Sequence, residues 1–233
     1  MSGIAGILFD KDGVLVDFQA TWGPASARAI RAFAADDAQA RALARAVDFD
    51  LDAERYQPAS VFIAGSGEDT INAWMPVLGN DAARILGIMK RIHVEGLDCA
   101  ESPPEVSVAL NALRGMGLPM GIATNDAEWS AKAQMEKLGL TDLFTSIHGS
   151  DSGHGAKPGP GMITAFAAHL GAEPGRIVMV GDSTHDLHAA HAAGAIRVGI
   201  GTGPASLEDL APHADHVIAT MAELPGLVTA LNG

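Results

Sequence analysis

The feature that most constrains this chain is a short apolar run that ends in two carboxylates. Residues 4–9 are apolar apart from one glycine, and Asp10, Asp12 and Gly13 follow them. Such a run is typical of a buried strand in a parallel sheet. Ligand sites of open α/β sheets lie at the carboxyl ends of their strands. Because alternate residues of an extended chain face the same side, Asp10 and Asp12 could converge on one ligand.

Two neighbouring carboxylates repel each other unless a positive charge neutralises them. A divalent cation is the simplest such charge, and Mg²⁺ usually binds one or two carboxylates together with phosphate oxygens of a substrate. This stretch therefore predicts a Mg²⁺ site. The alternative is an acidic turn after the strand, in which Asp12 and Gly13 serve only as turn residues.

The composition indicates a globular, acidic protein. Of the 233 residues 48% are hydrophobic, and the net charge is −13, which argues against a nucleic-acid partner because such binding depends on Lys and Arg. The single cysteine, Cys99, excludes an internal disulfide and favours a reducing compartment. No apolar run approaches the roughly 20 residues that span a bilayer, and the N-terminus lacks the basic segment of a signal peptide. We expect a cytoplasmic protein without a membrane partner, as a monomer or homodimer.

The pattern changes after the first strand. Residues 21–47 are rich in Ala and Arg with apolar residues at helical spacing, and further helical patterns follow without a convincing strand. This predicts an all-helical domain at residues 17–96, inserted into an α/β core formed by residues 1–16 and 97–233. From residue 103 onwards strand and helix patterns alternate. That alternation predicts a doubly wound parallel sheet with right-handed crossovers.

Polar groups follow, or lie near, the ends of several predicted strands. In addition to Asp10 and Asp12 they are Thr124, Asn125, Lys157, Asp182 and Asp186. In a parallel sheet these ends share one edge. One carboxylate could act as a nucleophile, and another could protonate a leaving oxygen and later activate water. A metal and a lysine could stabilise charge on phosphoryl oxygens, so the set predicts phosphoryl transfer.

Four motifs resemble those of the haloacid dehalogenase superfamily of phosphatases, and within it the phosphoglycolate phosphatase-like group with a helical cap. Residues 9–15 resemble the DxDG(T/V) motif, and residues 122–125 resemble the second motif, a strand ending in Ser or Thr. Lys157-Pro158 is similar to the third motif and residues 181–186 to the GDxxxD fourth motif. The motifs occur in family order. The resemblance therefore covers the whole chain and implies a Rossmann-like core with residues 17–96 as its cap.

The resemblance implies a role for each matched residue. Asp10 would be the nucleophile and a Mg²⁺ ligand. Asp12 would be the general acid/base, with its backbone carbonyl as a further metal ligand. Thr124 and Asn125 would bind the phosphoryl group, and Lys157 would neutralise it.

The fourth motif would complete the site. Asp182 would bind Mg²⁺. Asp186, with Ser183 beside it, would support Lys157 or a metal-bound water. Taken singly, Thr124 and Asn125 could instead cap a helix, and Lys157 could be a solvated surface lysine.

We therefore expect a Mg²⁺-dependent phosphomonoester hydrolase that forms an aspartyl-phosphate on a small phosphorylated metabolite. Phosphoglycolate is the first candidate, on resemblance alone. A β-phosphoglucomutase-like mutase keeps all four motifs, and a catalytically silent phosphate-binding protein is a further alternative. Asp12 argues against a dehalogenase, because a halide leaves without a proton. The absence of lysine between Asp12 and Met89 argues against a Schiff-base phosphonatase.

Three further features have local interpretations. The loop Ala64–Asp69 could select substrate, or it could be a helix–helix turn capped by Ser66. Asp126 could cap a helix or support the site. His185, His188 and His191 do not share one helix face well enough to predict a zinc site, although His185 could line the mouth of the active site.

Overall fold

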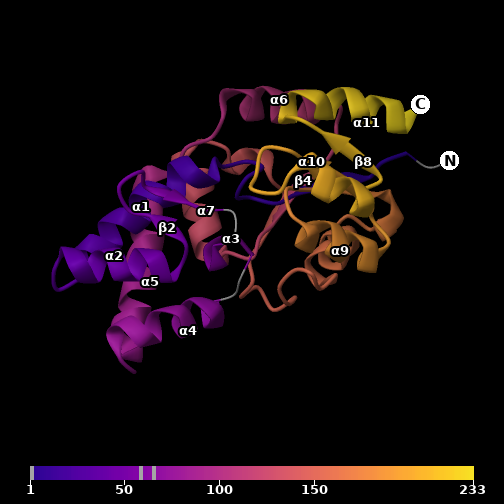
Figure 1. Ribbon diagram of the computed structural model, residues 1–233. Helices are drawn as coiled ribbons and strands as arrows, with labels where there is room; N and C mark the ends of the chain where they lie inside the picture. The colour runs from indigo at the N-terminus through magenta and orange to yellow at the C-terminus, as the bar shows by residue number, and fades with distance from the viewer. Residues whose placement is uncertain (1–2, 58–59, 65–66) are drawn as a thin grey trace. The chain divides into compact units, whose positions relative to one another are not determined.

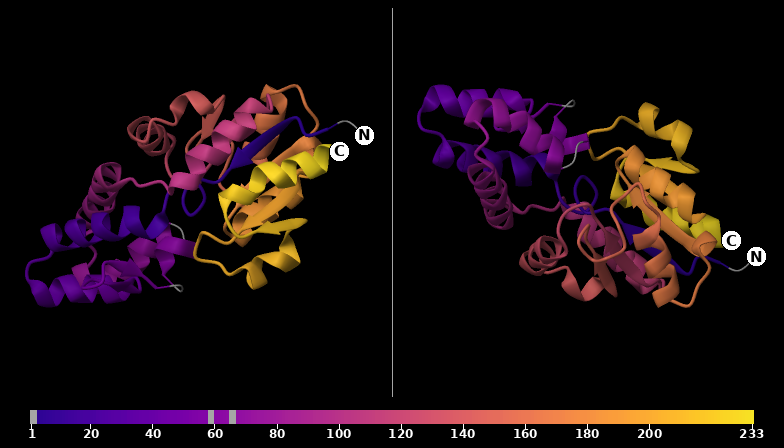
Figure 2. Two further views of the ribbon diagram at one scale, coloured as in Figure 1. Left: turned by 90° about the horizontal axis from the view of Figure 1, so that it is seen from above. Right: turned by 90° about the horizontal axis from the view of Figure 1, so that it is seen from below.

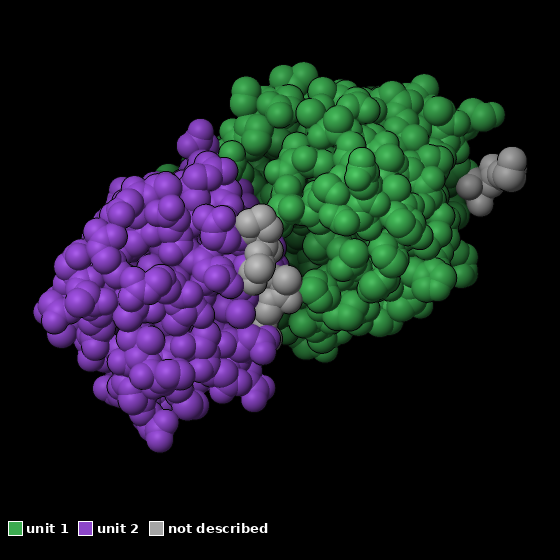
Figure 3. Space-filling view, viewed as in Figure 1, with its two compact units in different colours: residues 1–17, 102–233 green, residues 18–101 purple. Residues whose placement is uncertain are grey.

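The structure of the protein is a computed structural model, in which residues 3–57, 60–64 and 67–233 are described. The chain forms two compact units, one from residues 1–17 and 102–233 and the other from residues 18–101 (Figure 3). The expected insertion, residues 17–96, ends before this second unit does. The reason is that helix α5 (Ala82–Cys99) continues beyond residue 96.

The first unit is built on a six-stranded sheet. Its strands are β1 (Gly6–Phe9), β4 (Met120–Ala123), β5 (Ser146–His148), β6 (Ile177–Gly181), β7 (Ile196–Ile200) and β8 (His216–Ile218). The strand order is β5-β4-β1-β6-β7-β8, and every pairing is parallel. Strand β1 is therefore central, with Leu8 aligned with Gly121 of β4 and with Met179 of β6. This confirms the predicted parallel α/β sheet.

Helices cover both faces of this sheet (Figures 1 and 2). They are α6 (Pro104–Gly115), α7 (Glu128–Lys137), α8 (Gly161–His169), α9 (Thr184–Ala193), α10 (Leu207–Leu210) and α11 (Leu224–Asn232). Ile7 and Phe9 of β1 pack in one core cluster with α6 and α11, whereas Leu8 packs in another with α8 and α9. This alternation follows from the two-residue period of a strand, and it makes β1 apolar on both faces.

The second unit is mainly helical. Its elements are α1 (Phe18–Phe33), α2 (Asp37–Ala46), β2 (Phe49–Asp50), β3 (Arg55–Tyr56), α3 (Val61–Ala64), α4 (Gly67–Leu78) and α5. Apolar side chains from α1, α2, α4 and α5 form its core, in which Trp74 is fully buried. Ser66 of the proposed substrate loop lies outside the described residues.

The helical pattern of residues 21–47 forms two helices, α1 and α2, which separate where Asp36 adopts an extended conformation and its side chain caps α2 by accepting from the N–H of Gln39. The expectation of an all-helical unit is wrong, since β2 and β3 pair antiparallel. The Asp50 side chain accepts hydrogen bonds from the next turn, and such short strands give no periodic signal in the sequence.

Among the described residues, no helix combines the length and the apolar character that crossing a bilayer requires.

Candidate active site

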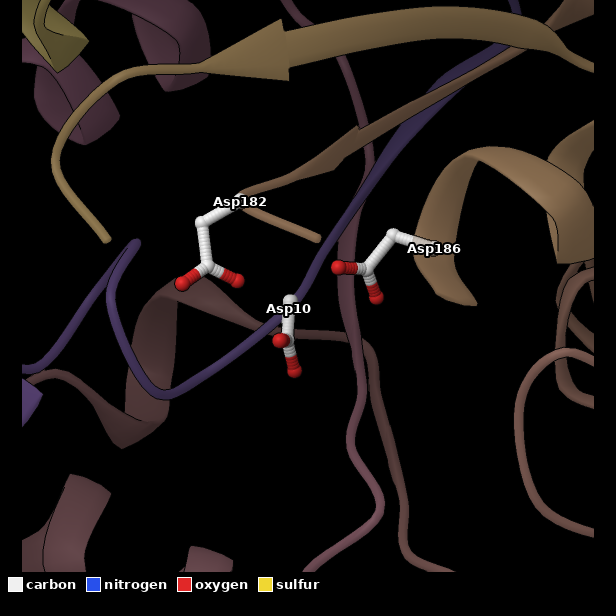
Figure 4. A group of neighbouring side chains, drawn as sticks. All are labelled: Asp10, Asp182 and Asp186. Atoms are coloured by element: carbon white, nitrogen blue, oxygen red, sulfur yellow. The ribbon is translucent and has the colours of Figure 1, made fainter. Parts of the chain in front are cut away.

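The candidate site lies at the carboxyl edge of the sheet, where β1 and β6 end side by side. Asp10 follows β1 directly, and its N–H donates to the carbonyl of Val180 in β6, so the sheet fixes its backbone. Asp182 follows β6, and Asp186 lies in the first turn of α9. The three buried carboxylates lie close together (Figure 4), with ligand oxygens within 4.8 Å of one another. The structure thus brings together three acids that the sequence placed at this edge.

Lys157 is buried among these acids. Its Nζ lies 2.7 Å from Asp10 Oδ1 and 2.6 Å from Asp186 Oδ1, and it donates to the carbonyl of Ala123 at 2.8 Å. Burial alone would lower the pKa of Lys157, but the carboxylates of Asp10 and Asp186 outweigh burial and raise it above its usual value. Lys157 is therefore a charged partner of Asp10 and is not a solvated surface lysine.

Asn125 fixes the loop that carries Lys157. The backbone N–H of Lys157 donates to Asn125 Oδ1 at 2.8 Å, and Asn125 Nδ2 donates to the Lys157 carbonyl at 3.0 Å. This pair of bonds joins the end of β4 to a loop that is distant in the sequence. Asn125 thus has a positioning role that the sequence did not reveal, and phosphoryl binding by Asn125 stays a prediction.

The acids repel one another and are poorly solvated. Burial, followed by the charge of Asp186, raises the pKa of Asp10 to about 7, although Lys157 opposes the shift. Burial and the charge of Asp10 raise the pKa of Asp182 well above its usual value. A divalent cation would favour the ionised form of both groups, because metal ligation requires deprotonated carboxylates.

The donor set fits a hard, oxygen-preferring cation. Asp186 is largely engaged already, since its Oδ1 contacts Lys157 and its Oδ2 accepts from the N–H and Oγ of Ser183 at 3.1 and 2.6 Å. Asp10 and Asp182 are therefore the carboxylates best placed to hold a metal. Buried carboxylate oxygens are suitable ligands for Mg²⁺. Of the alternatives for Asp186, the structure favours support of Lys157.

Two glycines pack directly against Asp182. A Cβ atom would lie 2.1 Å from Asp182 Oδ2 at Gly13 and 1.7 Å from it at Gly203. Gly13 also has a φ of 76°, a conformation that residues with a side chain rarely adopt. Thr202 Oγ1 donates to the Gly13 carbonyl at 2.6 Å, which joins the two loops. Thr202 and Gly203 were not predicted from the sequence, in which their signal is a Gly-Thr-Gly stretch after β7.

Asp12 lies on a tight turn after β1. Val16 N–H donates to the Lys11 carbonyl at 2.9 Å and Gly13 N–H donates to the Val16 carbonyl at 2.8 Å, which closes the turn. The Asp12 side chain is 21% exposed and contacts Lys11 Nζ, at 2.7 Å through Oδ2. The acid/base role of Asp12 stays a prediction, but its position next to Asp10 in the chain leaves it at the same edge of the sheet.

The remaining predicted residues have local partners. Thr124 follows β4, is buried, and accepts from the N–H of Asp126 through Oγ1 at 3.1 Å. Ser183 caps α9 in a reciprocal arrangement with Asp186. His188 pairs with His213, with 3.3 Å between Nε2 and Nδ1. Within the described ranges, the three acids of Figure 4 are the only group of three or more potential ligands found for a metal.

The fold and this edge define a parallel, doubly wound α/β core with an acidic, lysine-paired centre. The family model of haloacid dehalogenase-like hydrolases matches residues 4–194, and the chain therefore belongs to this family. The family and fold predicted from the motifs are confirmed.

Relatives were found among both characterised sequences and solved structures. A phosphoglycolate phosphatase of Neisseria meningitidis is 38% identical over 125 residues, covering 52% of this chain and 53% of that protein, so the match spans about half of the relative's length. A phosphoglycolate phosphatase of Yersinia pestis is 30% identical over 95% of this chain and 91% of its own length. The crystal structure of a predicted phosphoglycolate phosphatase from Haemophilus somnus has a TM-score of 0.76 at 20% identity, with 97% of this chain and 99% of that chain covered. At 20% identity, the similarity to this crystal structure shows a shared fold only.

Proposed function

We propose that the protein is a Mg²⁺-dependent phosphomonoesterase that acts through an aspartyl-phosphate on Asp10. The observation that carries the proposal is the buried contact of Asp10 with Lys157, at 2.7 Å, beside the carboxylate of Asp182. A solvated acidic turn would not bury a carboxylate and a lysine together at the end of a central strand. Burying a carboxylate and an ammonium together carries a large desolvation penalty, and such buried charges are concentrated at functional sites.

The geometry of Asp10 suggests which oxygen attacks. Its Oδ1 contacts Lys157 Nζ and accepts from the backbone N–H of Lys11 at 2.7 Å. We therefore assign Oδ2 as the nucleophile, which would form a bond to phosphorus while the bond from phosphorus to the ester oxygen breaks. Lys157, held by Asp186 and by Asn125, would stabilise negative charge on the phosphoryl oxygens.

Asp12 would transfer the protons. In the first step it would give a proton to the leaving ester oxygen, which departs as an alcohol. In the second step the Asp12 carboxylate would take a proton from water as the water oxygen attacks phosphorus. The bond from phosphorus to Asp10 then breaks, phosphate leaves, and both carboxyl groups return to their starting states.

Asp10 and Asp182, with the backbone carbonyl of Asp12, would hold the Mg²⁺. When bound, this ion would neutralise the acids and the phosphoryl oxygens. Gly13 and Gly203 contribute by leaving room for the Asp182 carboxylate between their loops. We propose a small phosphorylated metabolite as substrate and phosphoglycolate as the first to test, on the resemblance of the motifs and the names of the two relatives.

The test is turnover of p-nitrophenyl phosphate by the purified protein, with Mg²⁺ and with a chelator, followed by a panel of small phosphate esters that includes phosphoglycolate. We expect phosphate release that needs Mg²⁺ and that is lost in Asp10→Asn. Conversion of a sugar phosphate to its isomer without net phosphate release would instead establish the mutase alternative. Binding without turnover of any ester would establish a silent phosphate-binding protein.

A further inference from the structure

Lys11 is a second buried lysine at this edge of the sheet, and the proposed chemistry does not use it. Its side chain is 0% exposed although it lies between two candidate catalytic acids in the sequence. A lysine ammonium is strongly hydrated, so its burial is unfavourable unless several acceptors replace the lost water. The contacts of Lys11 Nζ therefore indicate what this residue does.

The ammonium of Lys11 contacts the side chains of Asp12, Gln134 and Asp126. Nζ lies 2.9 Å from Asp12 Oδ1 and 2.7 Å from Asp12 Oδ2, so both oxygens of this carboxylate share one cation. It also donates to Gln134 Oε1 at 2.6 Å and lies 3.2 Å from Asp126 Oδ2. Three segments of the chain meet here, namely the turn after β1, the loop after β4, and helix α7.

The side chains of the Lys11 partners other than Asp12 are buried. Gln134 is fully buried in α7. Asp126 accepts from the N–H of Ala127 through Oδ1 at 2.7 Å, and its own N–H donates to Thr124 Oγ1. Lys11 is thus fixed from behind by groups that belong to the folded core. Asp12, with 21% of its side chain exposed, is the most exposed of its carboxylate and amide partners.

We propose that Lys11 is a positioning residue that holds the Asp12 carboxylate at the site where it exchanges protons with the ester oxygen and with water. The inference rests on the proposed function, since it assigns Asp12 the proton transfers. An aspartate on a turn can adopt several rotamers, whereas one that accepts from the buried Lys11 ammonium is restricted to those that keep this contact; one oxygen would keep it while the other exchanges the proton. Asp126 and Gln134 would act through Lys11, and none of the three would touch the substrate.

Esters with different leaving groups can distinguish a Lys11 that positions the acid Asp12 from a Lys11 that only stabilises the fold. An alkyl phosphate releases a strongly basic alkoxide and needs a proton at that oxygen, whereas p-nitrophenyl phosphate releases a stable phenolate and does not. General acid catalysis contributes about 10²- to 10⁴-fold where it is needed. Because kcat/KM reports the steps up to departure of the leaving group, it isolates this proton transfer from the later hydrolysis.

The experiment compares kcat/KM of wild-type protein and Lys11→Met for phosphoglycolate and p-nitrophenyl phosphate, with Mg²⁺ present. For the alkyl ester we expect a loss of about 30-fold or more, and for the aryl ester a loss below about 3-fold, given the size of general acid catalysis. Lys132→Met is the matched control. Lys132 is an exposed lysine on α7, the helix that also carries Gln134, and it pairs with Glu128. Its ratio of alkyl to aryl kcat/KM should equal that of the wild type.

Lys11→Met leaves two carboxylates without their cation, and this could prevent folding. The double variant Lys11→Met/Asp126→Asn removes one negative and one positive charge together, and it should fold and show the same selective loss of alkyl ester turnover. Circular dichroism and a thermal melt check that each variant is folded.

The outcomes separate this inference from the proposed function. If the wild type is active and the folded Lys11 variants lose both esters by the same factor, or lose neither, the positioning role of Lys11 is overturned. If the wild type hydrolyses neither ester, the proposed function itself is overturned, and this inference with it.

Discussion

The acidic cluster should make the stability of the metal-free protein depend on pH in an unusual direction. Burial, and next the charge of Asp186, raises the pKa of Asp10 from 3.8 to about 7. A carboxyl group with a higher pKa in the folded state binds more protons there than in the unfolded state. Its contribution to stability is therefore present at low pH and is lost as the pH rises through its folded pKa.

The shift sets the magnitude of this effect. The pKa of Asp10 rises from 3.8 in the unfolded chain to about 7 in the folded protein, and a tenfold change in proton affinity corresponds to about 1.4 kcal/mol. At most about 4 kcal/mol of unfolding free energy should therefore be lost between about pH 4 and pH 8.

Mg²⁺ should oppose this loss. A cation that binds only the folded protein contributes about 2.7 kcal/mol at 100 times its Kd. Because ligation requires ionised carboxylates, the contribution should be near this value at about pH 8. It should be below about 1 kcal/mol at pH 5, where Asp10 must first release a proton.

The assay is urea unfolding of wild type and Asp10→Asn between pH 5 and pH 8, with Mg²⁺ and with a chelator. The variant is the control for other titrating groups. One of these is His148, whose pKa is lowered mainly by its burial, so that it changes stability in the opposite direction. Without metal, the variant should gain stability relative to wild type as pH rises; with Mg²⁺ at pH 8 this advantage should shrink or reverse. Parallel pH profiles of the two metal-free proteins, or equal stabilisation by Mg²⁺ at pH 5 and pH 8, would refute the reasoning.

Three substitutions test individual parts of the site. Asp12→Asn should slow both formation and hydrolysis of the phosphoenzyme, each by about 10²-fold or more, in a rapid-quench assay; an unchanged hydrolysis rate would assign the base elsewhere. Asn125→Ala frees the Lys157 loop and should lower kcat by about 10-fold or more with an unaltered Mg²⁺ affinity, and loss of metal binding instead would show that Asn125 does not act through Lys157. Gly203→Ala places a methyl group against Asp182 and should weaken Mg²⁺ binding measured by calorimetry, whereas wild-type affinity would mean that the loop moves aside freely.

The sequence predicted the sheet well because its strands carry a strong signal. Strands β1, β4 and β6 are fully buried, so they appear as continuous apolar runs, and each is followed at once by polar residues. Parallel topology then places those residues at one edge without further information. The acids at positions 10, 182 and 186 were brought together for this reason, and Lys157 joined them as the resemblance implied.

The details that the sequence did not reveal depend on contacts between distant parts of the chain. Lys11 lies in a turn where a lysine is ordinarily solvated, and its burial arises only because Asp126 and Gln134 supply acceptors from other elements. The two bonds of Asn125 to the Lys157 backbone likewise depend on the tertiary fold. The β2–β3 pair is too short to show a period. The hydrophobic pattern of a helix or strand predicts which of its faces is buried, but it does not predict which polar side chains contact one another in the fold.

The bond from the Asp10 N–H to the Val180 carbonyl has a consequence for how such a protein can diversify. Asp10, the proposed nucleophile, is bonded directly to the neighbouring strand of the sheet, so neither loop insertions nor exchange of the region 18–101 need displace it. New substrates could be acquired by altering the loops and the region 18–101 while the Asp10 carboxylate keeps its position. Engineering of the protein should therefore leave β1 and Asp10 unchanged and vary the loops and the region 18–101.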